Sequence, residues 1–306
     1  YIIHCKLANM EKNQIVILED RGLIAVEGAD AKDFLQNIIS NNIEKVSISN
    51  SIFSGIFTAQ GKYLYEFFII KNNNGYFLDC DSTFKEDLIK HLSKYKLRSK
   101  IEIKDLSSSY VIGITSAEKF KETQNEVASK EKTIFYRESP FFLDTRSIKL
   151  GARILSSLEK LHLTIKKMNL KIVDKSYYLK TAHSEGIPIQ GIKNLQDSLF
   201  SLESNFEELN AIDFKKGCYV GQENTARMKL KNKVRRKLIP IITKNSLKIS
   251  DEIKFKEQVV GKVLIDGAYP FALFKLFDPS FSEFYKKDLK VNETDVQILV
   301  PSHFKF

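Results

Sequence analysis

The sequence is poor in the residues that build metal sites and disulfide frameworks. Its 306 residues include three cysteines (Cys5, Cys80 and Cys218), five histidines and no tryptophan. The cysteines are odd in number and widely spaced, and none stands in a C-x-x-C pair, so we expect neither disulfides nor a zinc site. The histidines form no H-x-x-x-H pair either. We therefore expect no bound metal ion, and a reducing compartment: the cytoplasm, or the mitochondrial matrix in a eukaryote.

Long apolar runs are also missing. No stretch approaches about 18 consecutive apolar residues, so we expect no transmembrane helix and no membrane partner. The first ten residues contain His4 and Lys6 and lack a long apolar segment, which argues against a secretory signal.

Acidic residues are in the minority, with 38 Asp and Glu against 48 Lys and Arg, a net charge of +10. Such an excess accompanies anionic partners in some proteins and reflects a lysine-rich composition in others. For the net charge of the whole chain, both interpretations stay open.

Strand and helix patterns alternate without repeats, which predicts an α+β protein. Asp30 precedes a segment with apolar residues at helical spacing and is expected to cap a helix over Ala31–Ile39. Further strands are expected at 51–58, 63–71 and 76–80, with a tight hairpin turn at Gln60-Gly61-Lys62. Helices are expected at 84–95 and 175–183, whereas 158–168 carries mixed signals. After Pro240, short alternating strands predict a small C-terminal β domain.

The segment Phe214-Lys215-Lys216-Gly217-Cys218-Tyr219-Val220-Gly221-Gln222-Glu223 is the most informative part of the chain. Its two glycines allow a sharp turn or a close approach to a ligand. A thiol with lysines nearby can have a lowered pKa and be reactive. A tight turn with a buried Cys and Tyr would explain the same residues without a function.

This segment, with Arg227 four residues after Glu223, resembles the signature of the YgfZ-type folate-binding proteins, relatives of the glycine-cleavage aminomethyltransferase. Other segments also resemble this family: Asp20-Arg21-Gly22, Thr58-Ala59-Gln60-Gly61-Lys62, Asp144-Thr145-Arg146 and Gly151-Ala152-Arg153. The resemblance covers about residues 15 to 300. It implies an aminomethyltransferase-like fold of three domains around a central cavity, with a C-terminal β-barrel. We place the domains at 1–145, 146–237 and 238–306.

The resemblance also implies a function. Family members bind tetrahydrofolate and assist the assembly or repair of iron–sulfur proteins, including radical tRNA-modifying enzymes, without acting as conventional enzymes. Cys218 and Lys216 are the first candidates for function, followed by Tyr219, Gln222, Glu223 and Arg227 as folate-binding residues. The expected partners are folate and iron–sulfur client or assembly proteins, and the expected state is a monomer.

Three alternatives stay open. Glu66 could serve as the carboxylate of a folate-dependent aminomethyltransferase, although Cys218 stands where such an enzyme would carry an acid. The run Lys229–Lys237 carries six positive charges, which could contact RNA, a folate polyglutamate tail or only solvent. Glu223 and Arg227 could form a structural ion pair on one helix face.

Overall fold

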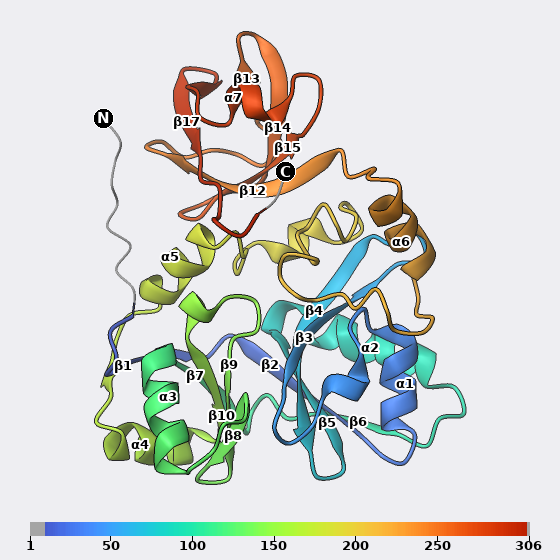
Figure 1. The fold of residues 1–306 in the computed structure, drawn as a ribbon, viewed down its shortest axis with the longest axis vertical. Coiled ribbons are helices and arrows are strands. Elements are labelled where there is room, and N and C mark those ends of the chain that lie inside the picture. The colour runs from blue at the N-terminus through green and yellow to red at the C-terminus, as the bar shows by residue number, and fades with distance from the viewer. Residues whose placement is uncertain (1–9, 305–306) are drawn as a thin grey trace. The chain divides into compact units, whose positions relative to one another are not determined.

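The computed structural model describes residues 10–304 (Figure 1). The chain forms two units. Among the described residues, the first unit contains 10–56 with Tyr65–Thr181 and Asn210–Val220, and the second contains Phe57–Leu64, Ala182–Leu209 and 221–304.

One mixed sheet of the first unit has the strand order β11-β1-β7-β10-β9-β8. Its strands are β1 (Gln14–Leu18), β7 (Val111–Thr115), β8 (Thr133–Tyr136), β9 (Ser139–Leu143), β10 (Ala152–Ser156) and β11 (Lys171–Ile172). Only the pairing of β1 with β11 is parallel. Helices α3 (Ala117–Glu126) and α4 (Leu158–Lys167) pack against this sheet. The stretch with mixed signals is thus a helix, and Ser157 caps it by accepting a hydrogen bond from the Lys160 amide.

A second sheet of the first unit has the order β3-β4-β5-β2-β6. Its strands are β2 (Arg21–Glu27), β3 (Ile52–Phe57), β4 (Tyr63–Asn72), β5 (Gly75–Asp81) and β6 (Glu102–Asp105). Helices α1 (Ala31–Ile38) and α2 (Lys85–Lys96) pack against it. Helix α5 (Ser176–Ser184) spans the boundary between the two units in the sequence, since Thr181 belongs to the first and Ala182 to the second. The first unit also has the short 3₁₀ turns η1 (Ile43–Lys45), η2 (Ser82–Phe84) and η3 (Ile148–Leu150), and the second has η4 (Ile192–Leu195).

Helix α1 shows how the sequence pattern leads to burial. Its buried residues are Ala31, Phe34, Leu35 and Ile38, which share one face at helical spacing. Asp30 is the N-cap residue of α1, as predicted, but its side chain makes no capping bond to the helix. Its carboxylate accepts instead from the backbone amide of Lys100 at 2.7 Å, a residue far along the chain.

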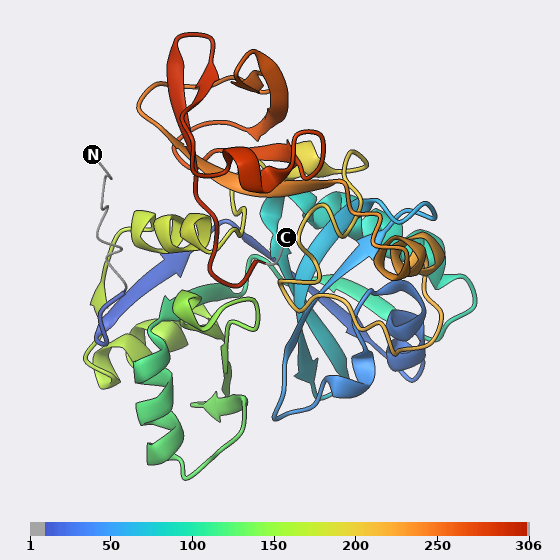
Figure 2. The same ribbon diagram turned by 45° about the horizontal axis from the view of Figure 1, so that its top comes forward.

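The second unit contains a closed barrel in the order β12-β15-β14-β13-β16-β17, which confirms the predicted C-terminal β-barrel (Figures 1 and 2, orange to red). Its strands are β12 (Arg236–Thr243), β13 (Glu252–Phe255), β14 (Gln258–Ile265), β15 (Phe271–Lys275), β16 (Leu289–Val291) and β17 (Thr294–Ile298). Closure leaves the sheet without free edges. Helix α6 (Gln222–Leu230) precedes the barrel and α7 (Phe281–Phe284) lies within its sequence.

None of the helices within residues 10–304 is long and apolar enough to cross a membrane.

Candidate functional site

Lys216 anchors the signature segment in the first unit. Its side chain is buried, and Nζ donates to the backbone oxygens of Gln36 (2.7 Å), Ile39 (2.6 Å) and Asn41 (3.0 Å). An ammonium group has three N–H donors, so these three carbonyls match its full capacity. The lysine that sequence reasoning placed among the reactive residues therefore holds its own loop against the end of α1.

Burial sets the ionisation of this lysine. Removal from water disfavours the charged form and lowers the pKa of Lys216 from 10.5 to about 8, while the nearby Asp213 acts in the opposite direction. The Tyr219 ring, itself buried, lies with its centroid 4.9 Å from Nζ. A cation over an aromatic face is stabilised by the ring quadrupole. Lys216 and Tyr219 are thus buried and in contact with each other, and they flank Gly217 and Cys218 in the sequence.

Cys218 lies between these two anchors and is exposed. The neighbouring Gly217 has open space where a side chain would begin, since no atom beyond Gly217 and its two chain neighbours lies within 4 Å of its ideal Cβ position. Cys80, in contrast, is buried in β5, and burial raises the pKa of its thiol to about 12. Cys5 lies outside the described residues. Among residues 10–304, Cys218 is the thiol that is open to solvent.

Gly221 begins the second half of the signature, in the second unit. Its φ of +85° is in the left-handed region that favours glycine, and a Cβ here would lie 2.4 Å from the Thr58 carbonyl oxygen. Behind it, the Asn224 side chain donates to the Gln60 carbonyl oxygen at 2.7 Å. The Thr225 hydroxyl contacts the Gly221 carbonyl oxygen at 3.0 Å and the Ser201 hydroxyl at 3.1 Å. The fold thus packs the predicted hairpin turn at Gln60–Lys62 against the start of α6.

Helix α6 presents the remaining signature residues. Glu223 and Arg227 are exposed and Gln222 is half-buried. Arg227 donates to the Asn224 amide oxygen at 2.8 Å. The structure does not pair Glu223 with Arg227, and Glu223 has no salt-bridge partner within residues 10–304. The carboxylate and the guanidinium on this helix are therefore open to a ligand.

Glu66 belongs to β4, within the part of that strand assigned to the first unit. Its side chain is half-buried. Burial acts to lower the pKa of Arg146, but Asp144, Tyr178 and, with a smaller effect, the negative charge of Glu66 together raise it. The predicted site residues therefore fall in both units, with Glu66, Lys216, Cys218 and Tyr219 in the first and those of α6 in the second.

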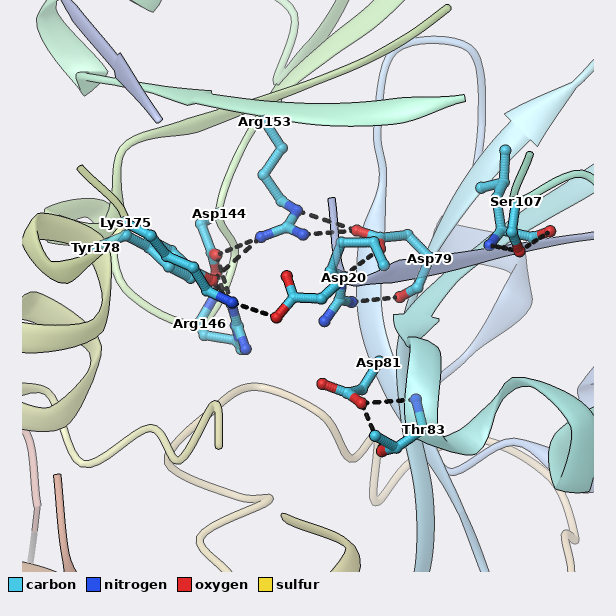
Figure 3. A network of polar contacts seen from close by, with 12 residues as sticks. Asp20, Asp79, Asp81, Thr83, Ser107, Asp144, Arg146, Arg153, Lys175 and Tyr178 are labelled. Atoms are coloured by element: carbon cyan, nitrogen blue, oxygen red, sulfur yellow. Dashed lines mark hydrogen bonds and ion pairs between the residues drawn. The ribbon is translucent and has the colours of Figure 1, made fainter. Parts of the chain in front are cut away.

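A buried charge network in the first unit was missed by sequence reasoning (Figure 3). Asp79 of β5 accepts from Arg21 Nε at 2.6 Å and from Arg153 Nη2 at 2.7 Å. Asp144 accepts from Arg146 through both oxygens, at 3.0 and 2.8 Å. The Tyr178 hydroxyl contacts Arg146 Nη2 at 2.9 Å and Arg153 Nη1 at 3.3 Å.

This network explains three of the family-like segments. Asp20-Arg21-Gly22, Asp144-Thr145-Arg146 and Gly151-Ala152-Arg153 each contribute an arginine to it. Burial alone would raise the pKa of Asp79, but Arg153 and Arg21 offset this effect and lower it. Asp79 could have been found from one signal, a carboxylate inside the apolar strand 76–80. Within residues 10–304, no group of three or more His, Cys, Asp or Glu side chains is arranged to hold a metal ion.

Comparison with known proteins places this geometry in context. The solved structure of glycine cleavage system aminomethyltransferase T from Bartonella henselae matches with a TM-score of 0.72 over 97% of this chain and 87% of that chain, at 10% identity. The chain therefore has the aminomethyltransferase fold, with mixed helices and sheets and a closed C-terminal barrel, as the sequence predicted.

The relatives found by sequence are of one kind within the proteins that share this fold. The iron–sulfur cluster assembly factor IBA57 homologue, mitochondrial, of Dictyostelium discoideum is 29% identical over 271 residues, which cover 79% of this chain and 65% of the relative. The protein of the same name in Neurospora crassa is 31% identical over 238 residues, covering 74% of this chain and 52% of the relative. The chain thus spans less than two thirds of the length of these relatives. No family model matches the chain. The relatives and the fold together confirm the resemblance to the YgfZ-type proteins.

Proposed function

We propose that this chain assists the assembly or repair of iron–sulfur proteins, with the Cys218 thiol as the group that contacts the cluster. One observation carries the proposal: an exposed thiol lies between two buried anchors, Lys216 and Tyr219. Fixed neighbours give the sulfur a defined position, while the space around Gly217 leaves room for a partner. The names of the relatives from Dictyostelium discoideum and Neurospora crassa support the same role.

Cys218 alone cannot complete the ligand set of a cluster, because iron–sulfur clusters are usually held by four cysteines. We therefore propose that a client or assembly protein, or an external thiol, supplies the other ligands. Clients would include radical tRNA-modifying enzymes, and the chain would act as a monomer. In a eukaryote the proposed location is the mitochondrial matrix, which matches the printed names of the relatives.

Tetrahydrofolate is the proposed ligand, and the donor set of α6 fits its chemistry. The exposed Glu223 carboxylate matches the adjacent N–H donors of a pterin ring, and the Arg227 guanidinium matches a glutamate carboxylate. Gln222 can donate and accept. Tyr219 and Glu66, which belong to the first unit, stay predicted folate-binding residues.

The test uses one purified protein for two measurements. Calorimetry with tetrahydrofolate measures binding, and a glycine-cleavage-type assay on the same sample measures methylene transfer. In parallel, cells lacking the protein receive wild type, Cys218→Ala or Cys80→Ala, and the activity of an iron–sulfur client enzyme is followed. The expected result is binding without turnover, and loss of client activity with Cys218→Ala alone. Full client activity with Cys218→Ala would contradict the role of the thiol.

A folate-dependent transferase is the second candidate, since Glu66 is a half-buried carboxylate whose charge acts on Arg146. This candidate predicts turnover that Glu66→Gln abolishes while folate binding persists. Such a result would replace the assembly role with catalysis.

A further inference from the structure

The basic run Lys229–Lys237 divides into two sets of residues in the second unit. Three of its six cations are paired with glutamates of the segment 203–208. Arg236 donates to both Glu203 oxygens, at 2.8 and 3.1 Å, and Lys229 and Lys237 bind Glu207 and Glu208 respectively. The chain thus already uses this run to bind carboxylates.

The remaining three cations, Lys231, Lys233 and Arg235, have no salt-bridge partner within residues 10–304. Together with Arg236 and Lys275 of β15 they line a hollow of about 530 Å³. Its remaining lining residues are Asn232, Phe277 and Asp278. Among the lining residues, five are cations and one, Asp278, is a carboxylate. Glu203, outside the lining, neutralises one of the five, Arg236.

Backbone pairing explains why these charges converge. Arg236 lies directly opposite Lys275 in the β12–β15 ladder, and the Leu276 amide donates to the Arg235 carbonyl oxygen at 2.9 Å. Lys231 and Lys233 enter from the turn that ends α6, where the Lys233 amide donates to the Met228 carbonyl oxygen at 2.9 Å. Like charges directly opposite each other in a strand pair are destabilising. An anion in the hollow would relieve this repulsion.

We infer that this hollow, which we call the basic pocket, binds a chain of glutamate carboxylates. The precedent lies in the same run, where Glu203, Glu207 and Glu208 of one short segment each bind one cation. Lys231, Lys233, Lys275 and Arg235 have no salt-bridge partner within residues 10–304. Their separate charges suit carboxylates spaced along a chain, with each lysine acting as a point charge and the arginine able to bind one carboxylate through two donors. The source is either an acidic segment of a partner protein or a γ-linked oligoglutamate tail, and both share this chemistry.

The helix dipole and RNA binding each explain the basic pocket less well than binding of a glutamate chain does. Lysines near a helix C-terminus interact favourably with the helix dipole, but this effect falls off within the last turn. The dipole of α6 therefore explains the position of Lys231. It does not explain Arg235 or Lys275, which belong to the barrel region. Single-stranded RNA would need several aromatic platforms, and Phe277 is the one aromatic residue among the pocket's lining residues.

The experiment measures fluorescence anisotropy of labelled tetraglutamate, α-linked in one arm and γ-linked in the other, titrated with the full chain at low salt. The pocket variant carries Lys231→Gln, Lys233→Gln and Arg235→Gln. The matched control carries Lys244→Gln, Lys248→Gln and Lys287→Gln, three exposed lysines of the same unit outside the pocket. Both variants lose three positive charges, so a difference between them reports position and not net charge.

We expect the pocket variant to weaken tetraglutamate binding roughly tenfold, while the control stays within about twofold of wild type. Tighter binding of the α-linked chain would indicate a protein segment as the source, and tighter binding of the γ-linked chain would indicate a folate tail. Equal losses in both variants would overturn the proposal. So would no binding of either chain at low salt, or a tetranucleotide RNA that competes more tightly than both. Because folate is not the probe, failure here would leave the proposed function untouched.

Discussion

Arg153 and Asp79 form an ion pair across the two sheets of the first unit, with Nη2 2.7 Å from Oδ2 and no exposure of either side chain (Figure 3). Arg153 belongs to β10 and Asp79 to β5, so the pair joins strands from different sheets. The Arg153 guanidinium also lies over the Phe68 ring, 4.4 Å from its centroid. A charge in such a place is tolerated only because partners surround it.

Asp79→Asn is expected to destabilise the fold by about 3–5 kcal/mol, because it leaves the buried Arg153 and the half-buried Arg21 without their shared counter-charge. Urea unfolding followed by circular dichroism measures the loss. The control is Glu44→Gln, which removes an exposed ion pair to Lys32 and should cost less than about 1 kcal/mol. Equal, small costs for both variants would show that the network adds little to stability.

The buried amine of Lys216 predicts a pH dependence of stability. Its pKa is lowered from 10.5 to about 8 in the fold, so between these values the unfolded chain binds a proton that the folded chain has released. The free energy of unfolding should therefore gain a rising contribution as the pH increases from about 8 to 10.5. Unfolding across this range measures it for wild type and Lys216→Met, which should lack the contribution.

Lys215→Met is the control for this pH series, because Lys215 is the exposed neighbour. Its slope should match wild type. Below pH 8, Lys216→Met should also be less stable than Lys215→Met, since three buried carbonyl oxygens lose their donor. A slope that persists in Lys216→Met would show that another group is responsible.

The two signature glycines should respond differently to alanine. Gly221→Ala places a Cβ 2.4 Å from the Thr58 oxygen at a φ of +85°, so the turn at 58–61 must shift. We expect a loss of roughly 2 kcal/mol or more. Gly217→Ala meets no atom within 4 Å, so it should change stability by less than about 1 kcal/mol. Thermal unfolding of both variants provides the comparison, and similar losses would contradict the described packing.

Thiol labelling should separate Cys218 from Cys80. Maleimide reacts with exposed thiolates, so Cys218 should be modified first, whereas Cys80 is buried with its pKa raised to about 12. Peptide mapping by mass spectrometry after short exposure measures each site, with a denatured sample as the control in which both react. Fast modification of Cys80 in the folded protein would mean that β5 opens readily.

Much of the local structure could be predicted from the sequence. The apolar spacing in α1 predicts its buried face, because helical periodicity is a local property. The short strands after Pro240 likewise predict the β domain that forms the barrel. The position of Asp30 at the N-cap of α1 was also predicted, whereas the bond of its carboxylate to the distant Lys100 amide was not.

The sequence by itself determined the apolar face of α1, most strands and the small C-terminal β domain, because each depends on neighbouring residues. The family resemblance that the signature carries implied the aminomethyltransferase-like fold, which the structural comparison bears out. Only the tertiary structure decided what the charged residues do. It brought Lys216 to carbonyls about 180 positions earlier in the chain, joined three separate arginines around Asp79 and Asp144, and divided the basic run into paired and unpaired cations. These contacts form between residues that are far apart in the sequence and meet only after folding. A local sequence pattern therefore cannot show which residues will be paired.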